Sequence, residues 1–418
     1  MSNNNIDSTP AGCVADIVLL VKNSLTYDFM AIIVDETEDA LSAQFPTTWK
    51  EALLSQKCLQ VLWGQHANLH YPHCANLLAG VSSICGIRRS FFDTVEEKVQ
   101  FLDFTMTQVC LVESVPDDRL KNTHYCSVLA ECITKFVSPF GYRDLASSPS
   151  FERWIRFAEK LSSGVFTTPF GQEGTFTTTT TLLQFWGRIC NSKRMYLGDD
   201  DSRKDLENVV PQLAASFFRA RITPWDTVDL DDELTEAVLA QADAFPPLVL
   251  IDTRATLSMI HTAMQEIGPT VLSTASSLGW LLYLTGSIVR NVFQSVEDTL
   301  SEPCSYVLLF AVECVNQRRQ DNSQHCASFH DFVEGAMLHF LSSMQLVLTS
   351  NRVSQAVSHI ITNVFSEKVK LFHFILFAIG HNITRDPSST SMCGDVKAIV
   401  RQSIDLIGDS CRDVPATI

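Results

Sequence analysis

The sequence predicts an all-α protein built from stacked helix pairs. Three observations support this fold class. Apolar residues recur at steps of three and four, which is the spacing of one helix face. No alternation of strands and helices is visible, and no break in composition divides the 418 residues. The periodicity indicates about fifteen helices of roughly 14–22 residues, joined by short connectors rich in Pro, Gly, Ser or Asp.

Four apolar stripes carry the helix prediction, and two capping patterns support it. The stripes are Val95, Val99, Leu102, Met106 and Val109; Leu257, Ile260, Met264 and Ile267; Phe329, Val333, Met337, Phe340, Met344 and Val347; and Val396, Ile399, Val400, Ile404 and Ile407. Thr94 with Glu97, and Thr48 with Glu51, have the spacing of a capping box, which satisfies free amides at a helix start. The β-branched run Thr175–Thr181 is the one stretch that favours an extended chain.

Helix pairs that tile a long chain predict a right-handed α-solenoid of about seven or eight units, in which each pair buries its faces on its neighbours. A strict sequence period is absent, which favours degenerate HEAT-like pairs over tetratricopeptide or ankyrin repeats. We expect one array over residues 1–418, with residues 1–10 disordered. One or two compact helical bundles are the alternative architecture.

The charge balance indicates what kind of partner the chain binds. The 31 Lys and Arg residues face 47 Asp and Glu residues, which gives a net charge of −16. Such a surface repels phosphate backbones and favours basic proteins. The densest acidic group is the connector around Asp229, Asp231, Asp232 and Glu233, which we call the acidic loop and predict as a partner-binding site. The plainer interpretation is a solvated loop, and an EF-hand is excluded by the missing central Gly and late Glu.

Cysteine usage points to a reducing compartment. The thirteen cysteines form no CxxC pair, and the first ten residues lack the features of a signal peptide. We therefore expect a cytosolic or nuclear protein, in which most cysteines act as small buried apolar residues.

Two segments have features of a metal site or a membrane span. His66, His70, His73 and Cys74 lie close in the sequence, but Pro72 breaks the helix and no second ligand pair follows, so we predict no metal. Thr270–Val289 is uncharged over twenty residues, which is long enough to cross a bilayer. About a third of it is Ser or Thr and no aromatic belt flanks it, so we predict a helix buried on several sides.

Catalytic motifs are absent from the sequence. We find no GxSxG elbow, Walker loop, HExxH or GxGxxG turn. The segment Gly408–Cys411 superficially resembles a nucleophile turn, but it ends a predicted helix, where Gly is an expected cap. We predict a protein that is not an enzyme and binds no cofactor. A helical enzyme with a polar pocket is an alternative that sequence patterns cannot test.

Five segments, in order, resemble the karyopherin-β family of nuclear transport receptors, and in particular its exportin-seven and Ran-binding-protein group. The segments are Phe45–Lys50 (FPTTWK), Ile84–Phe92 (ICGIRRSFF, followed by EEKVQFL), Leu182–Ile189 (LLQFWGRI), Leu278–Val289 (LGWLLYLTGSIV) and Ala336–Leu348 (AMLHFLSSMQLVL). Exportin-four is a related alternative. The resemblance runs from about Ile17 to about Ile407 and covers a central section of these longer receptors, without their N-terminal Ran-binding repeats.

The resemblance implies a HEAT-repeat receptor that binds protein cargo, Ran-GTP and Phe-Gly nucleoporins and moves between nucleus and cytoplasm through the nuclear pore. Because no counterpart of the N-terminal repeats is detected, it implies weak Ran-GTP binding. The alternative function is a general helical-repeat scaffold without a transport role, in which the acidic loop only adds solubility.

Overall fold

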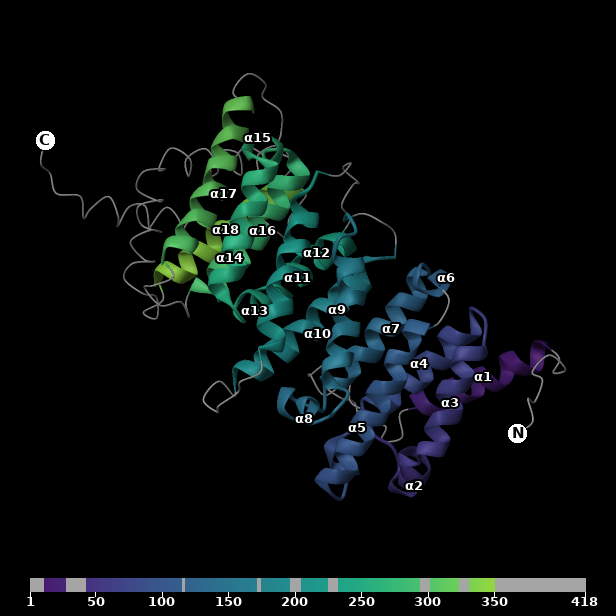
Figure 1. Ribbon diagram of the computed structural model, residues 1–418. Coiled ribbons are helices and arrows are strands. Elements are labelled where there is room, and N and C mark those ends of the chain that lie inside the picture. Colours follow the sequence, from purple (N-terminus) through teal and green to yellow (C-terminus); the bar gives the residue numbers. More distant parts are fainter. Residues whose placement is uncertain are drawn as a thin grey trace, which may run out of the picture. The chain divides into compact units, whose positions relative to one another are not determined.

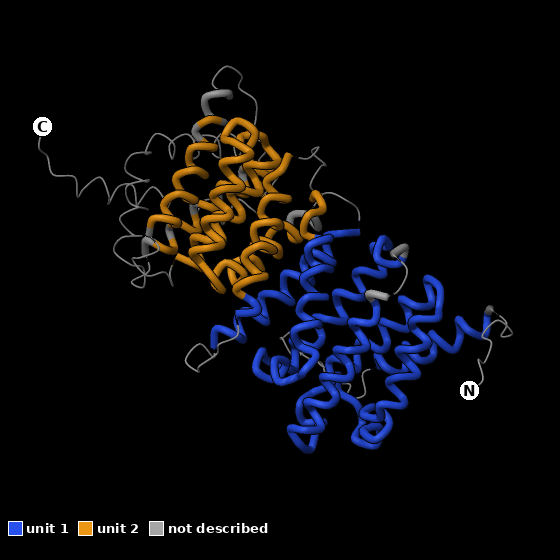
Figure 2. Tube along the Cα trace, in the orientation of Figure 1, with its two compact units in different colours: residues 1–165, 172–206 blue, residues 166–171, 207–418 orange. Residues whose placement is uncertain are grey.

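The computed structural model describes residues 11–27, 43–114, 117–170, 174–195, 204–224, 232–293, 301–322 and 331–349. These ranges consist of helices and short connections (Figure 1), and the one β feature within them is an isolated bridge between Ala43 and Ile87. The all-α prediction is therefore confirmed. The chain divides into two compact units, residues 1–165 with 172–206 and residues 166–171 with 207–418 (Figure 2).

Unit 1 is built in two layers of helices. Its helices are α1 (Ala11–Thr26), α2 (Lys50–Leu54), α3 (Gln56–Asn68), α4 (His73–Cys85), α5 (Val95–Cys110), α6 (Asp117–Leu120), α7 (Thr123–Phe136), α8 (Tyr142–Ala146), α9 (Phe151–Phe166) and α10 (Phe176–Arg194). α1 packs on α4, α4 on α7, and α7 on α10, which makes one continuous layer, named here the α1–α4–α7–α10 layer. α3 packs against both α4 and α5 in the second layer. Helices that each stack on the next are the arrangement expected of an α-solenoid.

The burial of α4 shows why such a layer is stable. The helix lies between α1 and α7 and has α3 behind it, so Leu78, Val81 and Ile84 are fully buried. α4 contains no Asp, Glu, Lys or Arg, because a helix covered on three sides leaves little room for solvated charge. Its burial depends on both neighbours, which is the defining property of a repeat array.

An aromatic cluster joins α7, α9 and α10 in the core of unit 1. The Trp154 ring contacts the rings of Phe136, Phe151 and Phe185, with centroid separations of 5.4, 6.2 and 5.5 Å. Trp186 follows Phe185 in α10, and its Nε1 donates to Ser162 Oγ on α9 at 2.8 Å. Buried aromatic rings of this size contribute much of the apolar burial of a core.

Unit 2 also stacks its helices on near neighbours in the sequence. Its helices are α11 (Asp205–Ile222), α12 (Asp232–Ala244), α13 (Pro246–Val249), α14 (Thr253–Ile267), α15 (Pro269–Leu272), α16 (Ala275–Asn291), α17 (Ser301–Asn322) and α18 (Asp331–Thr349). α16 packs most extensively on α18 and also contacts α12, α13, α15 and α17, whereas α14 packs on α17. The uncharged stretch 270–289 lies in α15, α16 and the turn between them, so it is not the single helix that was predicted. Residues 276–289 are buried, as predicted, whereas Thr270, Val271 and Thr274 are exposed. Across the described ranges, no helix combines the length and apolarity that a membrane crossing requires.

Glycines let α16 and α18 approach closely. A Cβ added to Gly279 would collide with the ring of Phe332, and one added to Gly286 would lie 2.8 Å from His339 Cδ2 and 3.1 Å from the Phe340 Cα. On α18, a Cβ at Gly335 would lie 2.7 Å from the Tyr283 hydroxyl. These contacts indicate that the interface requires glycine, because a β-carbon would force the two backbones apart.

Most of the sequence stripes occupy buried helix faces. Leu257, Ile260 and Met264 are buried on α14, and the α18 stripe from Val333 to Val347 is buried throughout. Phe329 and the stripe 396–407 lie outside the described residues, as do residues 1–10 and 408–411. The extent of the predicted array over residues 1–418, its handedness and its number of units stay predictions. The helices vary more in length than expected. Five of them have only four or five residues: α2, α6, α8, α13 and α15.

Two local predictions concerned helix starts. The capping box at Thr94 is confirmed, because its Oγ1 accepts from the Glu97 amide at 3.1 Å. The box predicted at Thr48 is wrong: Thr48 lies inside a 3-10 turn, Thr47–Trp49, and α2 starts at Lys50 without a side-chain cap.

The extended character of Thr175–Thr181 is also wrong, because this run enters α10 at Phe176. Thr179 Oγ1 donates to the Thr175 carbonyl at 2.8 Å, and Thr180 Oγ1 donates to the Phe176 carbonyl at 3.0 Å. These bonds satisfy the hydroxyls inside a helix. Burial of Thr178 and Thr179 against neighbouring helices outweighs the weak helix propensity of threonine.

The close approach of α16 to α18 predicts opposite effects for two Gly→Ala substitutions. Gly286→Ala should lower the free energy of unfolding by about 1–3 kcal/mol, because the new methyl group overpacks the interface. Gly64→Ala on α3 is the matched control: nothing lies within 4 Å of its added Cβ, so better helix propensity should raise stability by up to about 1 kcal/mol. Urea unfolding followed by circular dichroism measures both. Equal effects of the two variants would contradict the proposed role of Gly286.

Candidate partner-binding surface

The acidic loop predicted from the sequence is only partly within the described residues. Asp229 and Asp231 lie outside them. Asp232 and Glu233 are the first two residues of α12. The role of the loop in binding a partner stays a prediction.

Two of the segments that carry the family resemblance meet at one end of unit 1. Lys50, from the FPTTWK segment, places its Nζ 2.6 Å from Asp93 Oδ2 and 3.2 Å from Glu97 Oε2. Glu97 Oε2 also accepts from the Asp93 amide at 2.7 Å, so the same carboxylate closes the start of α5. The hydrogen bond that Lys50 donates to the Asp93 carboxylate is the main cause of the raised pKa of Lys50. This ion pair links the start of α2 to the start of α5.

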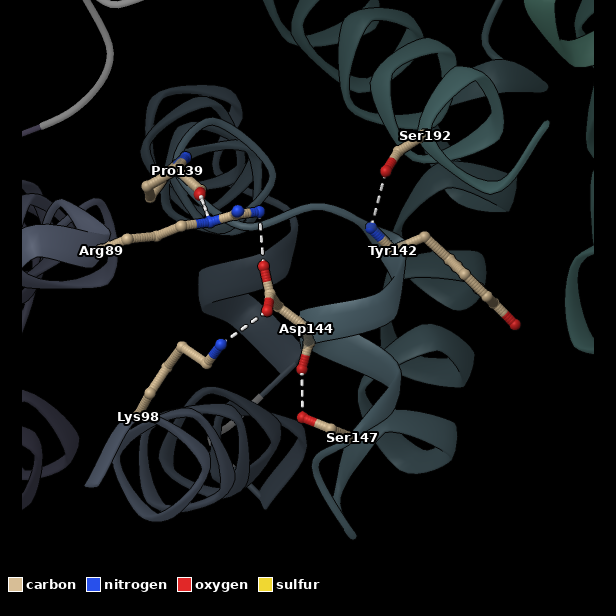
Figure 3. Close-up of polar contacts among 7 residues, drawn as sticks. All are labelled: Arg89, Lys98, Pro139, Tyr142, Asp144, Ser147 and Ser192. Atoms are coloured by element: carbon tan, nitrogen blue, oxygen red, sulfur yellow. Dashed lines mark hydrogen bonds and ion pairs between the residues drawn. The ribbon is translucent and has the colours of Figure 1, made fainter. Parts of the chain in front are cut away.

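Asp144 on α8 is the centre of a second charge cluster (Figure 3). Its Oδ2 lies 2.5 Å from the guanidinium of Arg89, and its Oδ1 lies 2.6 Å from Lys98 Nζ. The side chains of Asp144 and Lys98 are only 18% and 17% exposed, which protects their ion pair from screening. Arg89 belongs to the ICGIRRSFF segment, and its Nε donates to the Pro139 carbonyl at 2.6 Å. Asp144 thereby joins the turn after α4, the first turn of α5 and the α7–α8 connection.

The same region continues to α10 through Tyr142. The Tyr142 amide donates to Ser192 Oγ at 2.8 Å, and Lys193 Nζ lies 5.1 Å from the centre of the Tyr142 ring (Figure 3 shows the first contact). A Cβ at Gly141 would lie 2.8 Å from Ser192 Oγ, so glycine permits this close approach. The arrangement therefore connects successive helix pairs by ion pairs and hydrogen bonds.

The histidine cluster around His66 is part of the packing of unit 1. His66 is buried between Trp63 and Tyr125, and its Nε2 lies 3.0 Å from the Tyr125 hydroxyl. Burial, with a smaller effect from the Arg119 charge, lowers the pKa of His66 to about 4. Arg119 caps the end of α3 by donating to the carbonyls of residues 66, 67 and 69. Throughout the described ranges, no three His, Cys, Asp or Glu side chains gather as metal ligands would.

Unit 2 contains a buried arginine that sequence analysis missed. The Arg221 guanidinium lies 4.8 Å from the Phe217 ring and 5.7 Å from the rings of Phe170 and Trp280. Its Nε donates to Gln241 Oε1 at 3.1 Å, and its Nη1 donates to the Thr168 carbonyl at 2.8 Å. Burial lowers the pKa of Arg221 to about 9. Arg221 thus holds the segment 166–170 against α11, α12 and α16. No sequence pattern around Arg221 distinguishes it from a surface arginine.

The charge cluster at Asp144 predicts a clear stability difference between two neutralising substitutions. Asp144→Asn should lower the free energy of unfolding by about 1–3 kcal/mol, because it leaves two cations without their carboxylate partner. Glu152→Gln is the control, since the Glu152 pair with Arg156 is an exposed pair one helix turn apart and should cost under about 0.5 kcal/mol. Chemical denaturation measures both variants. A cost for Asp144→Asn no larger than that of the control would show that the cluster does not stabilise unit 1.

The lowered pKa of His66 predicts a pH dependence of stability. The unfolded chain protonates His66 near pH 6.5, but the folded chain does so only near pH 4. The unfolded state therefore binds more protons in this window, so stability is complete above about pH 6.5 and falls by up to about 1.4 kcal/mol per pH unit below it. The difference in unfolding free energy between the wild type and His66→Gln, measured from pH 7.5 to 4.5, isolates this residue. A difference that does not change with pH would contradict the prediction.

Comparison with known proteins finds similarity to exportins and to a Ran-binding protein. The chain is 24% identical over 289 residues to exportin-7 of Dictyostelium discoideum, which covers 66% of this chain and 28% of that protein. It is 22% identical over 319 residues to exportin-7-B of Xenopus laevis, covering 70% and 28% of the two chains. Ran-binding protein 16 of Drosophila melanogaster is 23% identical over 250 residues, covering 56% and 21%. No family model matches the chain.

The matches extend over more than half of this chain but under a third of each relative. They agree with the resemblance given by the FPTTWK and ICGIRRSFF segments, whose charged residues form the contacts of Lys50 and Arg89 described above. The chain is thus similar in sequence to exportin-7 and Ran-binding protein 16, and it spans about a quarter of the length of those proteins.

Proposed function

We propose that this chain is an exportin-like nuclear transport receptor segment that binds protein cargo, Ran-GTP and Phe-Gly nucleoporins. Its place of action is then the nucleus, the cytoplasm and the nuclear pore between them. The observation that carries this proposal is the similarity to exportin-7 and Ran-binding protein 16, whose names state export and Ran binding. The proposal involves no bond making or breaking, and GTP belongs to Ran.

The stacked helices support a binding role. Helix pairs that contact only their neighbours present a long surface made from many repeats, and small rotations between repeats adapt that surface to a folded partner. Ion pairs such as Arg89–Asp144 fix the ends of neighbouring helices, while the exposed faces are left for contact with partners. A surface of this kind suits recognition of proteins.

The net charge of −16 on this chain favours cargo proteins that have a basic surface. Opposite charges speed the encounter of two proteins more than they strengthen the final complex. The acidic loop is the densest acidic group in the sequence, and we assign it the first contact with a basic partner. Since exposed ion pairs each contribute at most about 1 kcal/mol, several must act together.

The test measures association and dissociation of partners by biolayer interferometry, with the full chain immobilised. The analytes are Ran loaded with a non-hydrolysable GTP analogue, Ran loaded with GDP, a Phe-Gly nucleoporin segment and a protein with a basic surface. We expect the Phe-Gly segment to bind and GTP-loaded Ran to bind weakly. We also expect the basic protein to associate severalfold more slowly when the acidic loop is neutralised to Asn and Gln, with a smaller change in dissociation. That association should weaken as salt rises from 0.1 M to 1 M, because the screening length falls from about 10 Å to about 3 Å.

A matched control variant neutralises four exposed glutamates elsewhere, Glu51, Glu96, Glu152 and Glu313. Equal slowing in the two variants would mean that total charge, and not the acidic loop, attracts the partner. Binding of the basic protein without any binding of Ran or the Phe-Gly segment would favour a general scaffold and overturn the transport role.

A further inference from the structure

The α1–α4–α7–α10 layer of unit 1 has the opposite charge balance from the chain as a whole. Its four helices contain five Lys or Arg residues and two Asp or Glu residues, Asp16 and Glu131, a balance of +3. The complete chain carries −16. The carboxylates of unit 1 lie mainly in the second layer and in the turns, where they pair with Lys50, Arg89 and Lys98.

In three helices of this layer, α4, α7 and α10, most of the exposed or half-exposed positions are neutral and polar. On α4, the half-exposed residues are His73, Asn76 and Ala79, which are spaced by three. They form one narrow ridge, called here the α4 ridge. The exposed or half-exposed positions on this side are His73, Asn76 and Ala79 on α4; His124, Ser127, Glu131 and Lys135 on α7; and Thr177, Thr181, Gln184, Arg188 and Asn191 on α10. Amides, hydroxyls and small side chains therefore make up most of this face.

Two lysines border the α4 ridge from opposite sides. Lys22 on α1 donates from Nζ to Asn76 Oδ1 at 3.1 Å, and Lys135 on α7 donates from Nζ to Ser82 Oγ at 2.9 Å. Both acceptors are neutral. Neither lysine forms an ion pair with a carboxylate inside the described part of the chain. The ammonium groups of these two half-exposed lysines donate to neutral oxygens. Their positive charge is therefore not neutralised by these contacts and can attract a carboxylate of a partner.

The spacing of these cations suits an extended acidic segment. Asn76 and Ser82 are six residues apart on α4, which separates them by about 9 Å along the helix axis. A segment in the extended polyproline II conformation advances about 9 Å in three residues and returns every third side chain to the same side, so carboxylates at every third position match this separation. Arg188 on α10 lies on the same helix face as Thr181, whose carbonyl accepts from Thr134 on α7, and extends the positive side. Glu131, one turn before Lys135, is the single carboxylate among the positions named above.

We propose that this face of unit 1, centred on Lys22, Lys135 and the uncharged ridge of α4, binds an extended acidic segment of a partner protein. The assignment does not depend on the transport role. It gives the chain two recognition surfaces of opposite charge preference, because the acidic loop selects basic partners. Hydroxyls and amides of α4, α7 and α10 would bond the backbone of the segment, while the two lysines select its carboxylates.

The test uses fluorescence anisotropy of labelled peptides with the full chain at 0.15 M salt. There the screening length is about 8 Å, so the two lysines outweigh the distant negative charge of the chain. One peptide carries Glu at every third position with Ser between, and a second carries Lys in place of Glu. The variant is Lys22→Gln with Lys135→Gln, since glutamine retains a donor for Asn76 and Ser82. The control is Lys57→Gln with Lys160→Gln, two exposed lysines on α3 and α9.

We expect the wild type and the control to bind the Glu peptide equally, and the Lys22/Lys135 variant to bind it about tenfold more weakly while keeping its helical circular dichroism. Failure of the wild type to bind the Glu peptide, or equal loss in both variants, would overturn the proposal. A single-stranded oligonucleotide that binds as tightly, with the same dependence on Lys22 and Lys135, would replace the acidic protein segment with a phosphate ligand. Ran binding is measured separately, so failure of the transport role leaves this result interpretable.

Discussion

The burial of each helix against the next one along the chain is the constraint on which the rest of this structure depends. α4 has no charged residue because α1, α3 and α7 cover it, and α16 is uncharged from Ala275 to Val289 because five other helices pack around it. A helix of either kind is unstable alone, since its apolar surface is buried only by its neighbours. Charged side chains are therefore displaced to helix ends, connectors and outer faces.

Polar contacts at the helix ends then determine how neighbouring helices are aligned along their axes. Apolar faces tolerate sliding and repacking, whereas an ion pair such as Lys98–Asp144 requires two particular residues to meet. Lys50, Arg89 and Asp144 link turns that are far apart in the sequence. Arg221 does the same in unit 2, where a planar guanidinium contacts aromatic rings and donates to a carbonyl and an amide oxygen. Segments that resemble exportins thus contain the residues that set the geometry of successive helices.

The sequence predicted the fold class well because helix periodicity is a local property. The stripes on α14 and α18, the capping box at Thr94 and the burial of the Trp280 helix all follow from spacing and hydrophobicity. The threonine run in α10 was predicted less well, because burial of Thr178 and Thr179 overrides their local preference. Asp144 and Arg221 were not predicted at all, since the ion-pair and hydrogen-bond partners of their side chains lie 20 to 55 residues away and only the folded chain brings them together. The acidic loop was chosen by charge density, a signal that identifies an attractive surface but not the face that a partner contacts.

The native cysteines can report which helices of this fold separate transiently. Of the ten cysteines in the described ranges, Cys13 is exposed, while Cys85, Cys132, Cys304 and Cys314 are among the seven that are buried. Burial raises the pKa of Cys304 and Cys314 to about 12, so almost no reactive thiolate exists in the closed structure. An alkylating reagent can modify these thiols only while their helices are transiently separated. The order in which the native thiols are modified would therefore report which helix pairs open first, without any label being introduced.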